Sequence, residues 1–382
     1  MRIFLVFHPS GNLSVPGSMT WYHNLYEPLV DLGHDVFMLR MDEVASNIKV
    51  KFRSNKFREV FNDVLLNTFR KENNKKHFDL FLSYFTNLDI DPHVIKLISK
   101  FNCPTANFSC NNTHQFHLVR EISPYFDYNL HSEKDATSKF NEIGANSVWF
   151  PMAANPKYYY PVKGQYIYDI SFVGAAYGKR PFYIHHLVQN GLIVDCFGPN
   201  WLINKPYSLL KKYKKEVERI GWILHSLLIT NLRERQKLSL KTYNYDLLTY
   251  LRLQNSERFH YPVPDIKMPV IFSQSKINLG FLEVYSGNNY QQVQKHLHLR
   301  EFEVPMCGGL YITNYSEELA EFYEPGKEIL TFFNEYDLTD KLKYFLDHDV
   351  QAESIRKNGY LRAINSHTYH KRFANLFLKI NL

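Results

Sequence analysis

The chain alternates short apolar runs with longer segments whose apolar residues recur every three or four positions. The first run, Ile3 to Phe7, is apolar throughout, which is typical of a strand buried on both faces of a sheet. An amphipathic stretch from Trp21 to Leu32 follows and stops at Gly33, a residue suited to ending a helix. Because this unit recurs along the chain, the sequence predicts an α/β fold of parallel sheets with crossover helices.

Length and proline spacing divide the chain into two such domains. Its 382 residues suit two domains of ordinary size. Three prolines lie between Pro151 and Pro161, as in a linker, and a new strand begins at Tyr168. The expected borders are a first domain over 1–155, a second over 156–364 and a closing helical segment over 365–382.

The net charge of +7 is concentrated in one part of the second domain. Basic residues far outnumber acidic ones over 205–241, within a segment that we predict to be a helical insertion over about 205–258. This insertion could lie on an anionic membrane surface, with its apolar stripe buried. Alternatively, the stripe packs on the second domain and the lysines face water.

The cysteines and the hydropathy pattern indicate the cellular compartment in which we expect the protein. The spacings of Cys103, Cys110, Cys196 and Cys307 fit no zinc site, which favours free thiols in a reducing environment. No run of 18 apolar residues is present to span a membrane. We expect a cytoplasmic protein, with any peripheral contact at the inner face of the membrane. The sequence carries no nucleic-acid recognition motif, so nucleic acid is not an expected partner.

The first candidate site follows the strand that starts at Tyr168. Gly174 ends this strand, Tyr177 lies in the loop that follows, and Lys179 and Arg180 stand where a helix begins. Glycines let backbone N–H groups approach a phosphate, and a helix N-terminus attracts anions. An arginine can grip a diphosphate through paired hydrogen bonds. The same residues also fit an ordinary strand–helix turn with a solvated cation pair.

The second candidate site is a charged cluster that leads into an apolar helix ending at Gly308 and Gly309. Arg300 could neutralise a phosphate, and the Glu303 carboxylate could accept hydrogen bonds from two ribose hydroxyls. The alternative is a helix whose first-turn acids simply match its dipole.

Two loops of the first domain are weaker candidates. Gly11 and Asn12 follow the first strand, and such a loop lies at the carboxyl edge of a parallel sheet, where ligands bind. His114 follows Asn111 and Asn112 after another short strand and could act as a base or contact a sugar. A lone loop histidine is, however, more often inert.

The segment Asp89-Ile90-Asp91 has the form of a metal-binding DxD motif. Because Pro92 follows it directly, we interpret it instead as the N-cap of a helix. No other cluster of carboxylates and histidines in the sequence suggests a metal site.

Taken together, these motifs resemble the CgeB-like glycosyltransferases, relatives of the group 1 family with the GT-B fold. The similarity is strongest in the last third of the chain and absent from the helical insertion. It rests on segments that follow one another in the family's order, namely Phe150–Asn155, Phe172–Arg180, Phe197–Trp201 with Gly198 at its turn, Lys295–Tyr315, Pro325–Ile329, Asn358–Tyr360 and His367–Arg372.

The resemblance implies two Rossmann-like domains facing each other across a cleft. It implies a metal-independent, hexosyltransferase-like enzyme without a tightly bound cofactor. Such an enzyme moves a sugar from a nucleotide diphosphate sugar, a UDP- or GDP-sugar, to a glycan, protein or lipid-linked acceptor on the first domain. Glu303 would bind the ribose, Lys179 and Arg180 would lie near the diphosphate, and the last helix would return to the first domain.

Two departures from the family pattern leave alternatives open. Lys295 stands where retaining members carry a glutamate, so the stereochemical outcome stays open. Asn111 and Asn112 stand where an aspartate is common, which leaves His114 as the candidate base. A sugar-nucleotide epimerase on the same fold and a catalytically degenerate sugar-binding or scaffold protein are the two alternative functions.

Overall fold

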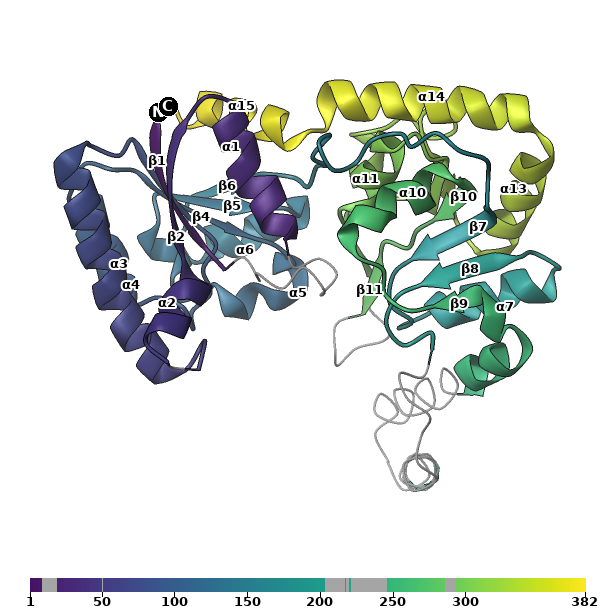
Figure 1. The fold of residues 1–382 in the computed structure, drawn as a ribbon, viewed down its shortest axis with the longest axis horizontal. Helices are drawn as coiled ribbons and strands as arrows, with labels where there is room; N and C mark the ends of the chain where they lie inside the picture. The colour runs from purple at the N-terminus through teal and green to yellow at the C-terminus, as the bar shows by residue number, and fades with distance from the viewer. Residues whose placement is uncertain (9–18, 50, 203–216, 218–219, 221–245, 286–292) are drawn as a thin grey trace. The chain divides into compact units, whose positions relative to one another are not determined.

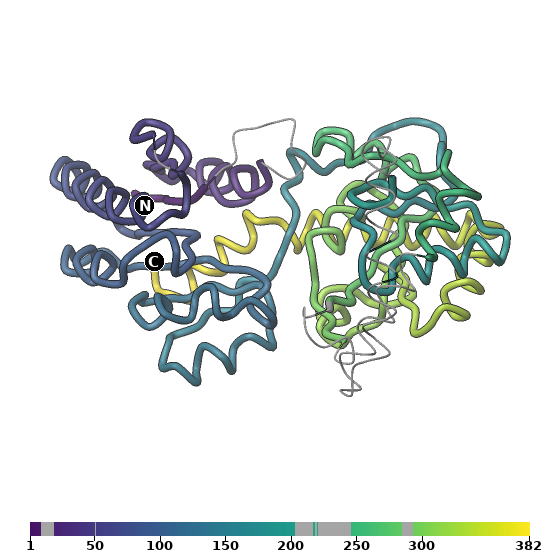
Figure 2. The backbone as a smooth tube through the Cα atoms, turned by 90° about the horizontal axis from the view of Figure 1, so that it is seen from below, coloured from purple at the N-terminus to yellow at the C-terminus, as the bar shows by residue number. Residues whose placement is uncertain are grey.

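The computed structural model describes the chain except for residues 9–18, 50, 203–216, 218–219, 221–245 and 286–292. It forms two compact units. Unit 1 comprises Met1–Tyr158 and Ser366–Leu382, and unit 2 comprises Tyr159–Asn365. Both chain termini therefore belong to unit 1, as Figures 1 and 2 show. The sequence analysis placed these borders after residues 155 and 364.

Unit 1 is built on a six-stranded parallel sheet with the order β2-β1-β3-β4-β5-β6. The central strand β1 is apolar and buried from its second residue onward, as expected of a strand covered on both faces. The strands are β1 (Arg2–Phe7), β2 (Asp35–Arg40), β3 (Leu80–Ser83), β4 (Thr105–Ser109), β5 (Tyr128–His131) and β6 (Ser147–Trp149).

Helices cover both faces of this sheet (Figure 1). Because crossovers are right-handed, the helices after β1 and after β2 must lie on opposite faces. Accordingly α1 packs with α15, whereas α3 packs with α2 and α4. The helices are α1 (Glu27–Asp31), α2 (Met41–Asn47), α3 (Asn55–Lys75), α4 (Pro92–Ser99), α5 (Asn112–Gln115), α6 (Thr137–Glu142) and α15 (Tyr369–Lys379).

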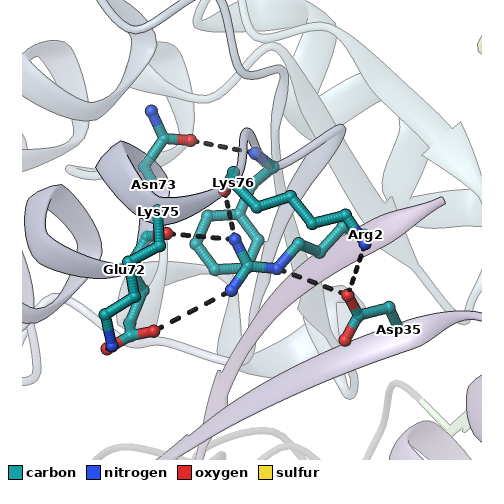
Figure 3. A network of polar contacts seen from close by, with 7 residues as sticks. Arg2, Asp35, Glu72, Asn73, Lys75 and Lys76 are labelled. Carbon is teal, nitrogen blue, oxygen red and sulfur yellow. Dashed lines mark hydrogen bonds and ion pairs between the residues drawn. The ribbon is translucent and has the colours of Figure 1, made fainter.

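Charged side chains fasten the amino edge of this sheet (Figure 3). The Arg2 guanidinium donates to the Glu72 carbonyl at 3.0 Å and lies 3.5 Å from the Asp35 carboxylate. Lys76 approaches the same Asp35 oxygen at 3.0 Å. The Arg2 guanidinium also stands 4.1 Å over the Phe78 ring. These contacts tie β1, β2 and the end of α3 together at the edge opposite to the one where ligands bind in such sheets.

The last helix, α15, completes unit 1. A bridge joins Ala154 to Thr368, and the Thr368 side chain caps the helix by accepting from the Lys371 N–H. The buried Arg372 guanidinium donates to the carbonyls of Pro151 and Met152 at 3.1–3.3 Å. The chain therefore leaves unit 1 after Tyr158 and returns to it for its final helix.

Unit 2 holds a second six-stranded sheet with the order β14-β13-β10-β7-β8-β9, parallel throughout. Counted from β7, this is the order 3-2-1-4-5-6 of the doubly wound fold, which reverses direction between β7 and β10. The strands are β7 (Tyr168–Val173), β8 (Val194–Phe197), β9 (Phe259–His260), β10 (Ser275–Leu279), β13 (Tyr311–Asn314) and β14 (Leu330–Phe332).

Helices α7 and α13 pack together on one face of this sheet, and α10 and α11 pack together on the other. An antiparallel hairpin, β11 (Glu283–Tyr285) with β12 (Val293–Lys295), leaves the end of β10. The helices are α7 (Arg180–Gln189), α10 (Met268–Ser273), α11 (Arg300–Met306), α12 (Glu317–Ala320), α13 (Glu335–Asp347) and α14 (Asp349–Ser366).

The predicted α/β class with two parallel sheets is confirmed. Most of the predicted insertion lies outside the described residues, and so does nearly all of the basic segment 205–241. Within the described part of the insertion, 246–254 is helical, and directly after it comes the edge strand β9 (Phe259–His260), which the sequence analysis missed. Among the described residues, every helix is too short or too polar to cross a membrane.

Candidate functional site

Ligands of doubly wound sheets bind beyond the carboxyl ends of the strands, where the strand order reverses. In unit 2 this point lies between β7 and β10, which pair in parallel with Leu279 opposite Phe172. The loop that begins at Gly174 follows β7, and Gly280 to Glu283 follow β10. The first predicted motif thus lies at the edge where this topology places a ligand.

Gly198 allows the loops after β7 and β8 to approach each other closely, because it has no side chain. Its φ is +151°, and a side chain there would meet the Gly174 carbonyl oxygen at 2.3 Å. The Gly174 N–H donates to the Phe197 carbonyl at 2.9 Å. The Trp201 indole N–H donates to the Gly174 carbonyl at 2.7 Å. The glycine at 198 is therefore required for the shape of the predicted phosphate-binding loop.

Arg180 is the first residue of α7, and its guanidinium bridges the two loops at the reversal point. It donates to the Ala175 carbonyl at 3.2 Å and to the Phe281 carbonyl at 3.4 Å. It also lies 4.1 Å from the centre of the half-exposed Tyr177 ring. Lys179 is exposed just before the helix. The structure thus brings together Gly174, Tyr177, Lys179 and Arg180 around one helix N-terminus.

Glu283 is a functional candidate that the sequence analysis missed. It follows β10, is 9% exposed and accepts from the Tyr183 hydroxyl at 3.3 Å. The hairpin pairs it in register with Lys295, whose ammonium group donates to the Tyr315 carbonyl at 2.8 Å. Only the parallel pairing of β7 with β10 brings Glu283 near α7, so no local motif could have revealed it.

An aromatic layer underlies these polar groups. The Tyr183 ring stacks on Phe281 at 5.1 Å, and Phe281 in turn meets Phe172 edge-on at 5.1 Å. Burial and the adjacent Glu283 carboxylate raise the pKa of Tyr183, so its hydroxyl stays protonated and can donate. Charged groups next to such an apolar layer interact more strongly than they would in water, because the local dielectric constant is lower.

The second predicted motif forms a separate cluster on α11. Glu303 is fully buried, and its carboxylate accepts from the Arg300 guanidinium one turn away on the same helix. Burial raises the pKa of Glu303, although the Arg300 charge opposes this shift. Tyr159 is also adjacent, since the Glu303 carboxylate contributes to the raised pKa of its buried hydroxyl. Arg300 thus pairs with Glu303 on α11, whereas Arg180 bridges the loops after β7 and β10.

Glu301 is a second buried carboxylate that the sequence analysis did not single out. It accepts from the Tyr311 hydroxyl at 2.7 Å and from the His298 N–H at 2.5 Å. Burial raises its pKa. Glu301 therefore fastens the segment before α11 to β13. The resemblance to the group 1 family selects Glu303 over Glu301, because Glu303 stands five residues before Gly308, as the ribose-binding glutamate of that family does.

The two glycines that end α11 have a packing role. Gly308 has φ +69°, and its missing side chain would point toward Pro161 at 3.6 Å. A side chain on Gly309 would lie 2.7 Å from the Asn278 amide and 2.8 Å from the Phe272 carbonyl oxygen. These glycines let the chain enter β13 beside α10.

The carboxyl edge of the unit 1 sheet carries amides and hydroxyls, a histidine and a buried acid. Asn107 accepts from the Ser83 hydroxyl and the Phe85 N–H, both at 2.8 Å. The half-buried His114 lies on α5, and burial lowers the pKa of its imidazole. The buried Glu133 accepts from the Thr113 N–H at 2.7 Å, at the start of α5. Gly11 and Asn12 lie outside the described residues.

The DxD-like segment is an N-cap, as predicted. Asp91 caps α4 by accepting from the His93 N–H at 2.8 Å. Asp89 is fully buried and bound by both arms of the Arg53 guanidinium at 2.9 and 3.1 Å. In the described part of the chain, no three histidine, cysteine or acidic side chains cluster so that they could hold a metal ion.

Comparisons with known proteins agree with this architecture. Residues 219–377 match the family model described as "Glycosyl transferase-like". No curated protein sequence matches the chain. The unit 2 segment that carries α11 and β13 is thus glycosyltransferase-like, which agrees with the function predicted from the sequence. Nothing in these comparisons identifies the CgeB-like branch.

Three solved structures show the fold. Sucrose-phosphate synthase from Thermosynechococcus elongatus is 12% identical, with a TM-score of 0.61 over 100% of this chain and 99% of its own. Anabaena HepE in complex with UDP-glucose is 9% identical, with a TM-score of 0.60 over 100% and 99%. A Listeria monocytogenes protein described as a putative UDP-N-acetylglucosamine 2-epimerase is 11% identical, with a TM-score of 0.51 over 98% and 93%. The chain has the GT-B fold.

Proposed function

We propose that this protein is a glycosyltransferase that moves a sugar from a nucleotide diphosphate sugar, most simply a UDP-sugar, to an acceptor bound by unit 1. The observation that carries the proposal is Arg180, whose guanidinium bridges the loops after β7 and β10 at a helix N-terminus. A cation, a helix dipole and glycine-shaped loops at this edge form an anion site. The match of residues 219–377 to a glycosyltransferase-like family supports the same assignment.

In the proposed reaction the bond between the anomeric carbon and the diphosphate oxygen breaks, and a bond to an acceptor hydroxyl oxygen forms. The nucleoside diphosphate leaves with the electron pair. Arg180 and Lys179 stabilise its developing charge, together with the N-terminus of α7, so a metal ion is not required for this step. Glu303 binds the ribose hydroxyls, with Arg300 holding its carboxylate in place.

The acceptor proton must pass to a base, and we propose His114 for this role. Burial and the neighbouring Lys139 lower the pKa of His114, so its imidazole is neutral near pH 7 and able to accept a proton. The neutral amides around Asn107 suit an uncharged, hydroxyl-bearing acceptor such as a glycan. All four cysteines are free thiols, which supports a cytoplasmic location for the reaction.

The decisive experiment is a thermal-shift screen against UDP, GDP, CDP, ADP and dTDP. A ligand at 100 times its Kd stabilises a protein by about 2.7 kcal/mol, which such a screen detects. We expect one nucleotide to stabilise the wild type and to lose that effect in Arg180→Ala. Arg362→Ala is the matched control, because this exposed arginine is bound to Glu328, just before β14 at the amino edge of the same sheet. Stabilisation by no nucleotide would refute the proposal.

Two alternatives remain to be separated by product analysis. An epimerase would convert a sugar nucleotide without any acceptor, so a new sugar nucleotide formed from donor alone would identify it. A scaffold protein would bind a sugar or nucleotide without turnover. The buried, paired Glu303 and the bridging Arg180 favour the transferase over the scaffold, because both charges are held in fixed positions.

A further inference from the structure

Glu283 is a carboxylate beside the proposed diphosphate site that has no role in the proposed mechanism. Only 9% of its surface is exposed. Removing a carboxylate from water is costly unless hydrogen bonds or opposite charges compensate. The Tyr183 hydroxyl supplies one such hydrogen bond. The fold therefore retains a buried acidic side chain close to a site that is otherwise cationic.

The main chain just before this carboxylate is held from three directions. The Phe281 carbonyl accepts from Arg180 on α7, and the Leu282 N–H donates to the Asn314 side chain on β13 at 3.1 Å. The Leu282 carbonyl accepts from the His296 N–H at 3.3 Å. A side chain on such a supported segment points in a fixed direction, as specific recognition requires.

Distance and charge together indicate what this carboxylate can bind. Phe281, whose carbonyl receives Arg180, and Glu283 are two residues apart, so their Cα atoms are at most about 7 Å apart. A carboxylate repels phosphate oxygens and only accepts hydrogen bonds, so it needs hydroxyl donors. In a sugar nucleotide the hydroxyls of the sugar extend away from the diphosphate. We propose that Glu283 binds hydroxyl groups of the donor sugar and thereby selects and orients that sugar. This inference rests on the proposed function.

A purely structural role is the competing explanation. Glu283 would then only anchor Tyr183, whose ring supports the aromatic layer below the site. The two roles differ in one respect. A structural anchor affects every ligand of the site, whereas a sugar contact affects sugar nucleotides but leaves nucleoside diphosphates alone.

The test compares two affinities in each variant of the full chain. The probes are the five nucleoside diphosphates of the screen and their glucose, galactose, mannose and N-acetylglucosamine derivatives, measured by titration calorimetry. The variants are Glu283→Gln, Tyr183→Phe and Glu324→Gln. Tyr183→Phe removes the hydroxyl contact and keeps the carboxylate. Glu324→Gln changes a glutamate paired with Lys327, just before β14 at the amino edge of the sheet.

We expect Glu283→Gln to weaken the preferred sugar nucleotide about tenfold and to leave its nucleoside diphosphate within about twofold. Tyr183→Phe should weaken the sugar nucleotide by less than about threefold, and Glu324→Gln should change neither affinity. Equal losses for both ligands, or no loss for either, would overturn the sugar contact while leaving the transferase intact. Wild-type protein that binds no nucleotide would instead overturn the proposed function itself.

Discussion

The two parallel sheets differ most at their carboxyl edges. In unit 1 the strand order reverses between β1 and β3; β3 and β4 carry buried amides and hydroxyls such as Asn107 and Ser83, and the buried acid Asp89 that follows β3 is paired with Arg53. In unit 2 it reverses between β7 and β10, and the corresponding groups are charged: Arg180, Glu283 and the Glu303–Arg300 pair. The two scaffolds thus place their charges differently: Arg53 of unit 1 pairs with a buried carboxylate, whereas Arg180 of unit 2 donates to main-chain carbonyls.

This difference fits the proposed assignment of the donor to unit 2 and of the acceptor to unit 1. A charged edge is suited to a diphosphate, because buried cations and helix N-termini replace the water that solvated it. Amides and hydroxyls such as Asn107 and Ser83 are suited to hydroxyl groups, which need donors and acceptors but no counter-charge. The difference between the two units can be tested further through the stability of each unit separately.

The largest expected effect falls on unit 1 alone. Arg372→Leu removes the hydrogen bonds to the Pro151, Met152 and Ser366 carbonyls and leaves these acceptors buried. We expect unit 1 to lose about 3–5 kcal/mol of unfolding free energy, and unit 2 to keep its own. Native-state hydrogen exchange read by mass spectrometry reports both units. Arg362→Leu, an exposed position on α14, should cost about 0.5 kcal/mol or less. Equal loss in both units would contradict their independence.

The next effect concerns pH. Burial lowers the pKa of His131 on β5 to about 4 from 6.5, so this imidazole is neutral in the folded state. Its contribution to unit 1 is complete above pH 6.5 and is lost as the pH falls toward 4, up to about 3 kcal/mol. The difference between wild type and His131→Gln isolates this effect from Glu133, whose raised pKa acts in the opposite sense as pH rises above 4.5. A parallel pH dependence in the two proteins would show that His131 does not contribute.

Unit 2 should respond to pH in the other direction. Burial raises the pKa of both Glu301 and Glu303, so folding favours their protonated forms, and their contribution falls as the pH rises above 4.5. Hydrogen exchange at pH 5 and pH 7 should show that unit 2 loses stability between these two pH values. The loss should be larger in the wild type than in Glu303→Gln, which lacks one of the two titrating carboxyl groups. A Glu303→Gln protein with the same pH dependence as the wild type would remove this contrast between the units.

A smaller effect is expected at Gly198. Gly198→Ala forces a Cβ atom against the Gly174 carbonyl oxygen, so we expect a loss of about 2–3 kcal/mol from unit 2 and weaker nucleotide binding. Gly191→Ala is the matched control, because Gly191 also has a positive φ, of +79°, but no atom within 4 Å of the added carbon. It should cost only about 1 kcal/mol and leave binding unchanged. Thermal melts with and without the nucleotide distinguish the two.

The smallest effect belongs to the α11 anchor. Tyr311→Phe removes the hydroxyl that donates to Glu301 at 2.7 Å, so we expect unit 2 to lose about 1–2 kcal/mol. Donor affinity should fall less than it does in Arg180→Ala, because Tyr311 acts only through the position of α11. Chemical denaturation together with nucleotide titration measures both. A loss of affinity as large as that of Arg180→Ala would place Tyr311 in direct contact with the ligand.

Local signals predicted much of the fold. The apolar run of β1, the glycine after α1 and the Asp91 cap of α4 each follow from side-chain chemistry over a few residues. The short strand β9 and the hairpin after β10 escaped prediction. Their residues have no distinctive periodicity, and these segments are strands because their backbones pair with a neighbouring strand.

The candidate site shows the same division. Arg180 is recognisable from sequence, since glycines and a cation follow a strand and precede a helix. Glu283 is not, because its relation to Tyr183 spans 100 residues and depends on the parallel register of β7 and β10. Burial is also invisible to spacing: Glu301 and Glu303 look alike in sequence, yet one binds Tyr311 and the other Arg300.

The return of α15 to unit 1 has a consequence for how the protein is made. A ribosome that has completed Tyr158 must still translate the whole of unit 2 before Ser366 appears. At 5–20 residues per second this interval is on the order of ten to forty seconds. During that time the Phe150 ring lacks the Phe373 partner that meets it 5.2 Å away in the finished fold. Unit 2, although encoded second, is therefore the first to have its complete sequence, and the nascent unit 1 is the part that would need a chaperone's protection.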